Sequence, residues 1–343
     1  MVMKIGVVGA SGYSGGELLR LLLGHPNFSL HYVAAGASAG ESITSIHPHL
    51  TALSGRKFEE TSVAKMNECD LLFFALPHGE SQKYVSELQA DIRVVDLGAD
   101  YRLSESSQWE KYYGGSHAGS WVYGAPELPG QRELIKGALR IANPGCYATS
   151  INLAIAPAVT SKIIDATDIV VVAASGVTGA GRSAKINLLG AETMNSLTSY
   201  KFGGIHQHTP EIEQTLDGLG ASGARISFTP ILAPMPRGIL ATVTAKISHS
   251  VQLAEVRSMY QDFYSTHGFV TLLPEGELPR TSSTLGSNSV HLQVAIDSHT
   301  QRLIVSCALD NLGKGAASAA LQNANLISGL KEDLGVPYTG VRA

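Results

Sequence analysis

One cysteine follows a proline–glycine turn and begins a helical pattern. Residues 143–145 read Asn-Pro-Gly, Cys146 comes next, and a short apolar run at 139–142 precedes the turn. The first amide groups of a helix have no partner and the helix dipole is positive there, so this position favours thiolate over thiol. We therefore predict that Cys146 is a nucleophile. The alternative is a buried structural cysteine, which we expect for Cys69 and Cys307 because both lie beside apolar runs.

Two histidines stand just before a second helix start. His206 and His208 precede residues 209–210, a Thr-Pro pair that suits a helix cap and a first helical position. An imidazole with a pKa near neutrality passes protons in both directions, so we assign His206 as the general acid/base. His206, His208 and Glu211 are also metal-ligand types, but the histidines precede the helix instead of lying one turn apart on its face, so we predict no metal. A surface or capping role stays open, more for His208 than for His206.

A glycine-rich loop lies at residues 9–15, after the first apolar run and before the first helical pattern. Its G-x-x-G-x-x-G spacing lets the backbone approach a pyrophosphate at the helix start, although any tight βα turn could also use it. Residues 34–35 are alanines where an acid would bind the ribose of NAD, and Ser38 follows. We therefore expect NADP(H), with Ser38 donating to the 2′-phosphate. The candidate cofactor residues of the loop are Gly9, Ser11, Gly12, Tyr13, Ser14 and Gly15.

Two further polar segments follow predicted strands. Residues 175–182 read SGVTGAGR and offer backbone donors plus Arg182 for an anionic group, or they form a glycine-rich loop with a solvated arginine. Arg102 stands just beyond a strand end, where parallel sheets bind ligands, although a surface salt bridge would explain it equally well. We expect the other histidines, such as His47, to be surface or loop residues.

The elements that must position these residues change in character along the chain. Before Cys146, apolar runs alternate with helical patterns such as 16–23 and 80–89, which predicts βαβ units and a Rossmann-type parallel sheet. After it, longer alternating strands with few helices predict an α+β domain built on a mixed or antiparallel sheet. The first set of strands is 4–8, 28–35, 71–76, 93–96 and 139–142; the second is 169–174, 225–229, 239–247, 291–296 and 302–309.

Length and composition fit this α/β plus α+β architecture. At 343 residues, two domains are expected. We place an NADP-binding domain at residues 1–146 with 311–343, completed by a terminal helix over 314–330, and a catalytic and dimerisation domain at 147–310.

The charge, the cysteines and the amino terminus narrow the possible partners and the compartment. A net charge of −4 argues against nucleic acid, and three scattered cysteines fit a reducing cytosol. The amino terminus reads straight into a strand and no apolar run is long enough to span a membrane, so we expect a cytoplasmic protein without membrane contact.

The segments together resemble the semialdehyde dehydrogenase family nearly end to end, and within it the branch that reduces an N-acetylated glutamyl phosphate in arginine biosynthesis. The resemblance rests on six segments in order, at 9–15, 143–147, 175–182, 206–212, 236–239 and 310–317. It implies an NADP-dependent enzyme with Cys146 as nucleophile and His206 as acid/base. A departure lies at Ala37, where many relatives carry arginine beside the serine, and Gln207 replaces a commoner arginine.

The resemblance also completes the expected site. The substrate residues are Arg102, Asn143, Arg182, Tyr200, His208 and Glu211, and the cofactor residues gain Ser175, Gly176 and Asn311. The partners it implies are a small acyl phosphate or semialdehyde, phosphate, and a second copy of the chain in a homodimer or homotetramer.

A nicotinamide domain followed by a nucleophilic cysteine predicts hydride transfer through a thioester. Two enzymes share this chemistry as alternatives, an aspartate-semialdehyde dehydrogenase and a reductase of carrier-bound aminoadipyl phosphate. An alternative of another class is an NADP(H)-binding redox sensor with an inert or regulatory thiol.

Overall fold

The structure is a computed structural model that describes residues 2–341. The chain forms two compact units, the first made of residues up to 126, Gly130–Pro144 and Ala316–Val336, the second of the remainder. Cys146 and residues 311–315 lie in the second unit, whereas the predicted boundary assigned them to the first. Local packing explains the difference, because the backbone of Gly315 lies against Cys146 and leaves no room for a Cβ. The functional roles of the two domains stay predictions.

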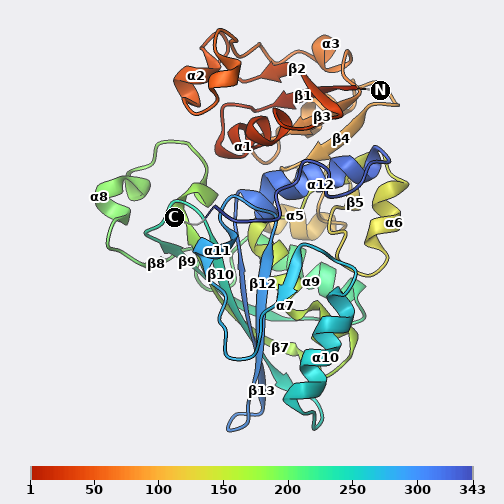
Figure 1. The fold of residues 1–343 in the computed structure, drawn as a ribbon, viewed down its shortest axis with the longest axis vertical. Helices are drawn as coiled ribbons and strands as arrows, with labels where there is room; N and C mark the ends of the chain where they lie inside the picture. The colour runs from red at the N-terminus through yellow and green to blue at the C-terminus, as the bar shows by residue number, and fades with distance from the viewer. Residues whose placement is uncertain (1, 342–343) are drawn as a thin grey trace. The chain divides into compact units, whose positions relative to one another are not determined.

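The first unit contains a six-stranded parallel sheet, as the alternating sequence predicts (Figure 1). The strand order is β2-β1-β3-β4-β6-β5. The strands are β1 (Met3–Val8), β2 (Phe28–Ala34), β3 (Leu71–Phe74), β4 (Arg93–Asp96), β5 (Val122–Tyr123) and β6 (Arg140–Ala142). Most of the central strand residues are fully buried, which suits near-continuous apolar runs between layers of helices.

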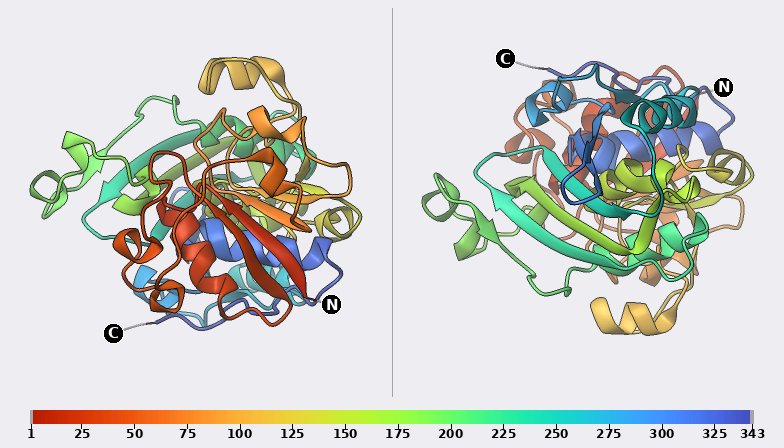
Figure 2. Two further views of the ribbon diagram at one scale, coloured as in Figure 1. Left: turned by 90° about the horizontal axis from the view of Figure 1, so that it is seen from above. Right: turned by 90° about the horizontal axis from the view of Figure 1, so that it is seen from below.

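Helices from both ends of the sequence complete this unit. The helix α12 (Ser318–Ile327) packs against α1 (Tyr13–Leu22) and β4, so the expected docking of the terminal helix on the first unit is confirmed (Figure 2, left). The predicted helix 80–89 is wrong in length, since only α4 (Gln82–Val85) forms. The remaining helices are α2 (Ile43–Ile46), α3 (Val63–Met66), α5 (Ser106–Tyr112) and α6 (Gln131–Lys136), with a 3₁₀ turn, η1 (Thr51–Leu53).

The second unit contains a seven-stranded mixed sheet of order β11-β12-β13-β10-β7-β9-β8, which confirms the predicted α+β class. The pairs β11–β12 and β7–β9 are parallel and the others are antiparallel. The strands are β7 (Ile164–Gly176), β8 (Thr198–Ser199), β9 (Ile226–Ala233), β10 (Ile239–Ile247), β11 (Val270–Leu272), β12 (Val290–Asp297) and β13 (Arg302–Leu309).

One face of this sheet is covered by helices. The helices α7 (Cys146–Thr160), α9 (His208–Gly218) and α10 (Leu253–Tyr264) contact its strands (Figure 2, right). Nearly every residue of α7 is buried, so the helix that begins with Cys146 runs through the core of the unit. Strand residues alternate between buried and exposed, and Val170 and Val172 of β7 keep 36% and 43% of their surfaces exposed. The alternation therefore leaves apolar side chains on the other face.

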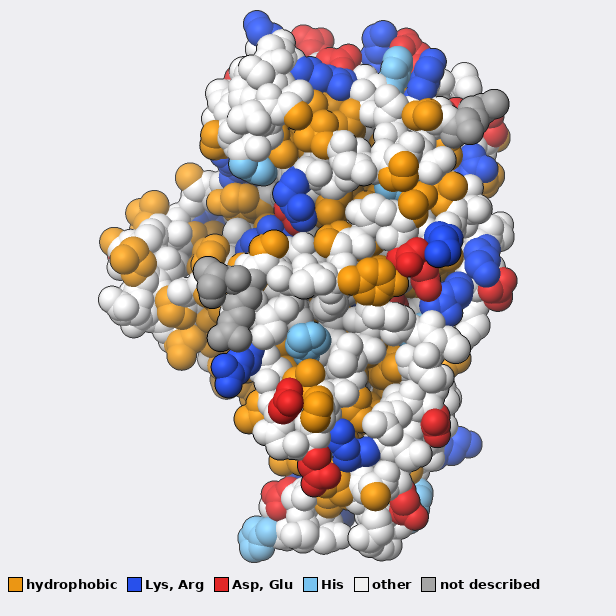
Figure 3. Space-filling view, in the orientation of Figure 1, with side chains coloured by type: hydrophobic (Ala, Val, Ile, Leu, Met, Phe, Trp, Pro, Cys, Tyr) orange, Lys and Arg blue, Asp and Glu red, His pale blue; other side chains and the backbone are white. Residues whose placement is uncertain are grey.

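A segment between β7 and α9, residues 181–205, projects from the second unit (Figures 1 and 3). We call it the arm. It contains the 3₁₀ turn η3 (Ile186–Leu188), followed by α8 (Gly190–Thr193) and β8. Its large exposed apolar side chains are Ile186, Leu189, Met194, Leu197, Phe202 and Ile205. The other short elements of this unit are η2 (Val177–Ala180) and α11 (Thr281–Thr284), and η4 (Gly313–Ala317) contains the boundary between the two units in the chain. Across residues 2–341, no helix has the length and apolar character needed to cross a membrane.

Candidate active site

The first residue of α7 is Cys146, and it is partly exposed. Gly145 precedes it in an extended conformation, with φ −70° and ψ 148°, and has no side chain to cap the helix. The amide groups at such a helix start have no partner within the helix. Cys69 and Cys307 are buried, as expected, and burial raises the pKa of Cys69 to about 12. Of the three thiols, only Cys146 has the exposure and helix position of a nucleophile.

A carboxylate from α9 reaches the start of α7. The Gly145 amide donates to Oε1 of Glu211 over 2.8 Å, and Glu211 is fully buried in the first turn of α9. The Glu211 carboxylate therefore connects the first turn of α9 to the N-cap of α7.

The residue after the nucleophile, Tyr147, packs on both predicted histidines. Its ring centroid lies 5.3 Å from that of His206 and 6.1 Å from that of His208. Tyr200 donates its hydroxyl to the Tyr147 hydroxyl over 3.0 Å. Burial raises the pKa of both tyrosines, so both hydroxyls stay protonated and serve as hydrogen-bond donors. The structure thus brings four sequence-predicted site residues of the second unit together around Tyr147: Cys146, Tyr200, His206 and His208.

His206 is buried and neutral. Its Nδ1 accepts the amide of His208 over 3.1 Å, so the ring proton lies on Nε2. Burial, followed by the nearby His208 and Lys201, lowers the pKa of His206 to about 2, while Glu211 acts in the opposite direction. The expectation of a pKa near neutrality is not met, because the ring lies against aromatic side chains instead of solvent. Protonating the ring therefore needs an added negative charge.

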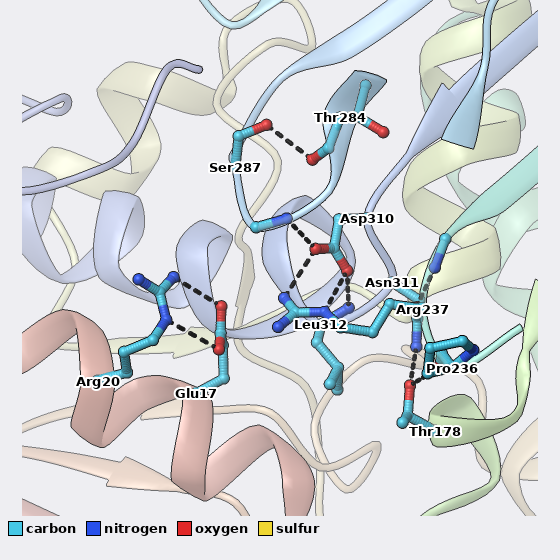
Figure 4. A network of polar contacts seen from close by, with 12 residues as sticks. Glu17, Arg20, Thr178, Pro236, Arg237, Thr284, Ser287, Asp310, Asn311 and Leu312 are labelled. Carbon is cyan, nitrogen blue, oxygen red and sulfur yellow. Dashed lines mark hydrogen bonds and ion pairs between the residues drawn. The ribbon is translucent and has the colours of Figure 1, made fainter. Parts of the chain in front are cut away.

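A polar network fixes the turn that leads into η4 (Figure 4). Asp310 pairs with Arg237, with 2.7 Å between Nη2 and Oδ2, and accepts the amide of Leu312 on Oδ1. The Asp310 carbonyl accepts the amide of Gly315 over 2.9 Å. A Cβ added to Gly315 would lie only 2.7 Å from Cβ of Cys146, so only glycine fits against the nucleophile here.

Three predicted cofactor residues of the second unit share one further network. Asn311 accepts the amide of Gly238 over 2.7 Å and donates to the hydroxyl of Thr178 over 3.0 Å. A Cβ on Gly176 would lie 2.7 Å from the backbone nitrogen of Arg237, so that glycine is required for close packing. The side chain of Ser175 also hydrogen-bonds to Tyr147, which connects this loop to the cysteine helix.

The glycine loop of the first unit is a tight turn that leaves no space for a Cβ at Gly9 or Gly15. Gly9 has φ +84°, and a Cβ there would lie 2.4 Å from the Ala75 carbonyl oxygen. A Cβ on Gly15 would lie 2.6 Å from Cα of Ala10. The loop leads directly into α1, whose first amide groups have no partner within the helix. This backbone cradle fits the pyrophosphate of a dinucleotide.

The segment that carries Ser38 follows the strand next to this loop. The amides of Gly9 and Ala10 both donate to the carbonyl of Ala34, the last residue of β2, and Ser38 is partly exposed in the turn that follows. His47 is buried instead of lying at the surface as expected. Its Nε2 lies 2.9 Å from the Ala10 carbonyl oxygen, so it holds the glycine loop from a segment that spacing did not connect to it.

Arg102 and Asn143 lie together in the first unit and are both buried. The Arg102 guanidinium donates to the carbonyls of Asn143 and Leu97, each over 2.8 Å, so the surface salt bridge is not what the structure shows. Oδ1 of Asn143 accepts from Asn323 over 3.0 Å. These contacts fix the turn that precedes Cys146 in the sequence.

Two features complete the comparison with the predicted site. Arg182 is exposed at the start of the arm, whereas the predicted residues His206 and His208 around Tyr147 are buried. Within residues 2–341, no three His, Cys, Asp or Glu side chains gather as a metal-binding group. Sequence reasoning missed Tyr147, Asp310 and Gly315 as individual contributors, and a glycine within the helical pattern after 314 was the available signal for Gly315.

Several solved structures that share this fold are aspartate-semialdehyde dehydrogenases. A probable one from Pseudomonas aeruginosa has a TM-score of 0.72 and 19% identity, covering 96% of this chain and 99% of that one. One from Candida albicans, solved with NADP, has a TM-score of 0.71 and 16% identity, covering 95% and 99%. At such low identity, the likeness establishes the fold alone.

Two family models match most of the chain. Residues 4–138 match "Semialdehyde dehydrogenase, NAD binding domain", and residues 146–311 match "Semialdehyde dehydrogenase, dimerisation domain". Fold and site therefore define an oxidoreductase of the semialdehyde dehydrogenase class, with a nicotinamide dinucleotide as cofactor and small molecules as substrates.

Curated relatives narrow the class to one family. Proteins named N-acetyl-gamma-glutamyl-phosphate reductase match from Paenarthrobacter aurescens at 49% identity and Acidothermus cellulolyticus at 51%, each over 341 residues, and from Salinispora arenicola at 52% over 342. Each match covers 99% of this chain and 99% of the relative. The chain belongs to the N-acetyl-gamma-glutamyl-phosphate reductase family.

Proposed function

We propose that the enzyme uses NADPH to reduce N-acetyl-L-glutamyl 5-phosphate to N-acetyl-L-glutamate 5-semialdehyde and phosphate, a step of arginine biosynthesis. The observation that carries the chemistry is Cys146 at the first position of α7, partly exposed, with the next residue, Tyr147, packed on two buried histidines. The aspartate enzymes share only the fold at 16–19% identity, whereas relatives near 50% carry the acetylglutamyl name. Neither the aspartate nor the carrier-bound alternative is favoured.

The first unit is the proposed cofactor domain. The glycine loop and the amino end of α1 hold the pyrophosphate, and Ser38 donates to the 2′-phosphate. The end of β2 is alanine, so no carboxylate there repels that phosphate, which supports NADP(H) over NAD. Ser175, Gly176 and Asn311 of the second unit are proposed to approach the cofactor. The bound nicotinamide supplies the hydride of the reaction.

Cys146 carries the covalent chemistry in this proposal. Its thiolate attacks the acyl carbon, the carbon–oxygen bond to phosphate breaks, and a thioester remains on Sγ. After reduction, the thiohemiacetal oxyanion collapses to the aldehyde and the carbon–sulfur bond returns its electrons to the thiolate. Each tetrahedral oxyanion needs hydrogen-bond donors that are already in place, and the amides of the first turn of α7, which have no acceptor within the helix, are the proposed donors.

His206 has two proposed roles that follow from its tautomer. In its neutral form, Nε2–H is a hydrogen-bond donor for the developing oxyanion. An anionic substrate bound beside the ring raises its pKa, which allows it to carry the proton. Arg182, Tyr200, His208 and the first unit's Arg102 and Asn143 are the proposed substrate residues. Because Arg102 already binds two carbonyls, its proposed contribution includes holding the turn before Cys146.

A homodimer is the proposed assembly of the chain. The dimerisation-domain match spans the whole second sheet and the arm. The exposed apolar side chains on β7 and along the arm are the surface that a second copy would cover; Figure 3 shows those of the arm.

The test is an assay of NADP reduction with N-acetylglutamate semialdehyde and phosphate, run beside aspartate semialdehyde. Phosphate-dependent turnover with the acetylated substrate, lost in Cys146→Ser while NADPH binding is retained, supports the proposal. Faster turnover of aspartate semialdehyde contradicts the substrate, and NADPH binding without turnover supports the redox-sensor alternative.

A further inference from the structure

The buried carboxylate beside the nucleophile is the strongest unassigned contact of the second unit. Glu211 accepts the Gly145 amide over 2.8 Å, and none of its surface is exposed. We infer that Glu211 is a positioning residue: it fixes Gly145 so that Cys146 begins α7 in one orientation. The resemblance placed Glu211 among the substrate residues, and this inference gives it a different task in the same reaction.

The helix geometry explains why this contact is needed. At many helix starts the N-cap side chain accepts the amide of the second or third helical residue, and the side chain of the third residue accepts the amide of the N-cap. In α7 the N-cap is Gly145 and the third residue is Ala148, and neither has a side-chain acceptor, so the acceptor of the Gly145 amide comes from another element. Glu211 comes from the first turn of α9, and α7 and α9 pack against each other. The carboxylate therefore connects the helix that begins with the nucleophile to the helix that begins with His208.

The chemistry of the proposed substrate supports the same assignment, and this step rests on the proposed function. An N-acetylated amino acid has an uncharged amide where a free amino acid has an ammonium group. A buried carboxylate is the usual partner of an ammonium, so the acetylated substrate gives it no opposite charge to bind. The Gly145 amide accounts for one of its oxygens without any substrate.

The negative charge has a second, measurable consequence. A carboxylate close to a thiol disfavours the thiolate, while the same shape without charge does not. Replacing Glu211 by glutamine keeps an oxygen that accepts the Gly145 amide and removes the charge. Replacing it by alanine removes both. Position and charge are therefore separable at this residue.

The experiment compares Glu211→Gln, Glu211→Ala and a matched control, Glu213→Ala. Glu213 lies two residues further along α9 and also accepts a backbone amide, that of Ile226 over 3.1 Å, but at β9 instead of α7. Three quantities are measured in each variant: kcat and KM for the semialdehyde, and the pH midpoint of Cys146 alkylation by iodoacetamide, which needs no substrate.

We expect kcat to fall by about 10²-fold in Glu211→Ala with little change in KM, because a displacement of the nucleophile by about 1 Å lowers the reaction rate by about that factor. Glu211→Gln should have a kcat at least about tenfold higher than Glu211→Ala, and its alkylation midpoint should shift to lower pH. Glu213→Ala should leave the midpoint unchanged. A glutamine variant as slow as the alanine variant, with a raised KM, would overturn the inference and assign Glu211 to substrate binding. An alanine variant with unchanged kcat and unchanged alkylation would also overturn it. Because alkylation is read without substrate, failure of the proposed substrate leaves this test intact.

Discussion

Adding one methyl group opposite the nucleophile, in Gly315→Ala, tests how closely its position is set. The new Cβ would lie 2.7 Å from Cβ and 3.2 Å from Cα of Cys146. Carbon atoms pack best at about 3.5–4.0 Å, so the contact falls short by about 1 Å. The Gly315 amide is tied to the Asp310 carbonyl, and Asp310 is in turn held by Arg237, so η4 resists moving away. The displacement therefore falls mainly on Cys146.

Overpacking of this kind costs about 1–3 kcal/mol of unfolding free energy. A shift of about 1 Å at a reacting atom lowers kcat by about 10²-fold. We expect both effects in Gly315→Ala, with the KM for NADP nearly unchanged because the glycine loop of the first unit is untouched.

The assays are urea unfolding, steady-state NADP reduction, and the alkylation rate of Cys146. Gly218→Ala is the matched control, since a Cβ there meets nothing within 4 Å at the end of α9. It should be neutral to about 1 kcal/mol stabilising, with normal kcat. Wild-type kcat and alkylation in Gly315→Ala would refute the reasoning.

Three other predictions follow from the pKa of His206, the end of β2 and the arm. The unfolded pKa of His206 near 6.5 exceeds its folded value of about 2, so its neutral form contributes stability above pH 6.5 that is lost as pH falls. Unfolding free energy should therefore decline below pH 6.5 by up to about 1.4 kcal/mol per pH unit more in wild type than in His206→Asn; parallel curves would contradict this. Ser38→Asp should raise the KM for NADP at least about tenfold with little effect on NAD, through repulsion of the 2′-phosphate, and equal changes for both cofactors would argue against the assigned site. Leu197→Asp should shift the sedimenting species toward monomer, while Leu278→Asp, an equally exposed leucine outside the arm, should not; identical sedimentation would remove the arm from the interface.

The architecture was predictable because hydrophobic periodicity carries it. Continuously buried runs such as 71–74 differ in pattern from alternating strands such as β10, so the sequence alone distinguishes the parallel sheet from the mixed one. Short elements such as β5 and α5 were not predicted, because two to seven residues give too few repeats of either period.

The candidate site divides in the same way. The position of Cys146 at a helix start was predictable because its signal is local, a turn followed by a helical pattern. The contacts of Glu211, Gly315 and His47 were not, because each joins residues far apart in the sequence through packing alone. The pKa of His206 depends on aromatic rings from separate elements, which no spacing reveals.

The thioester on Cys146 is the central claim, and peptide mass spectrometry tests it most directly. The enzyme is mixed with N-acetylglutamyl phosphate without NADPH, quenched in acid and digested. We predict one N-acetylglutamyl adduct on the Cys146 peptide, cleaved by hydroxylamine and released when NADPH is added before quenching. Full turnover in the presence of NADPH, with no adduct or with the adduct on another residue, would contradict the account.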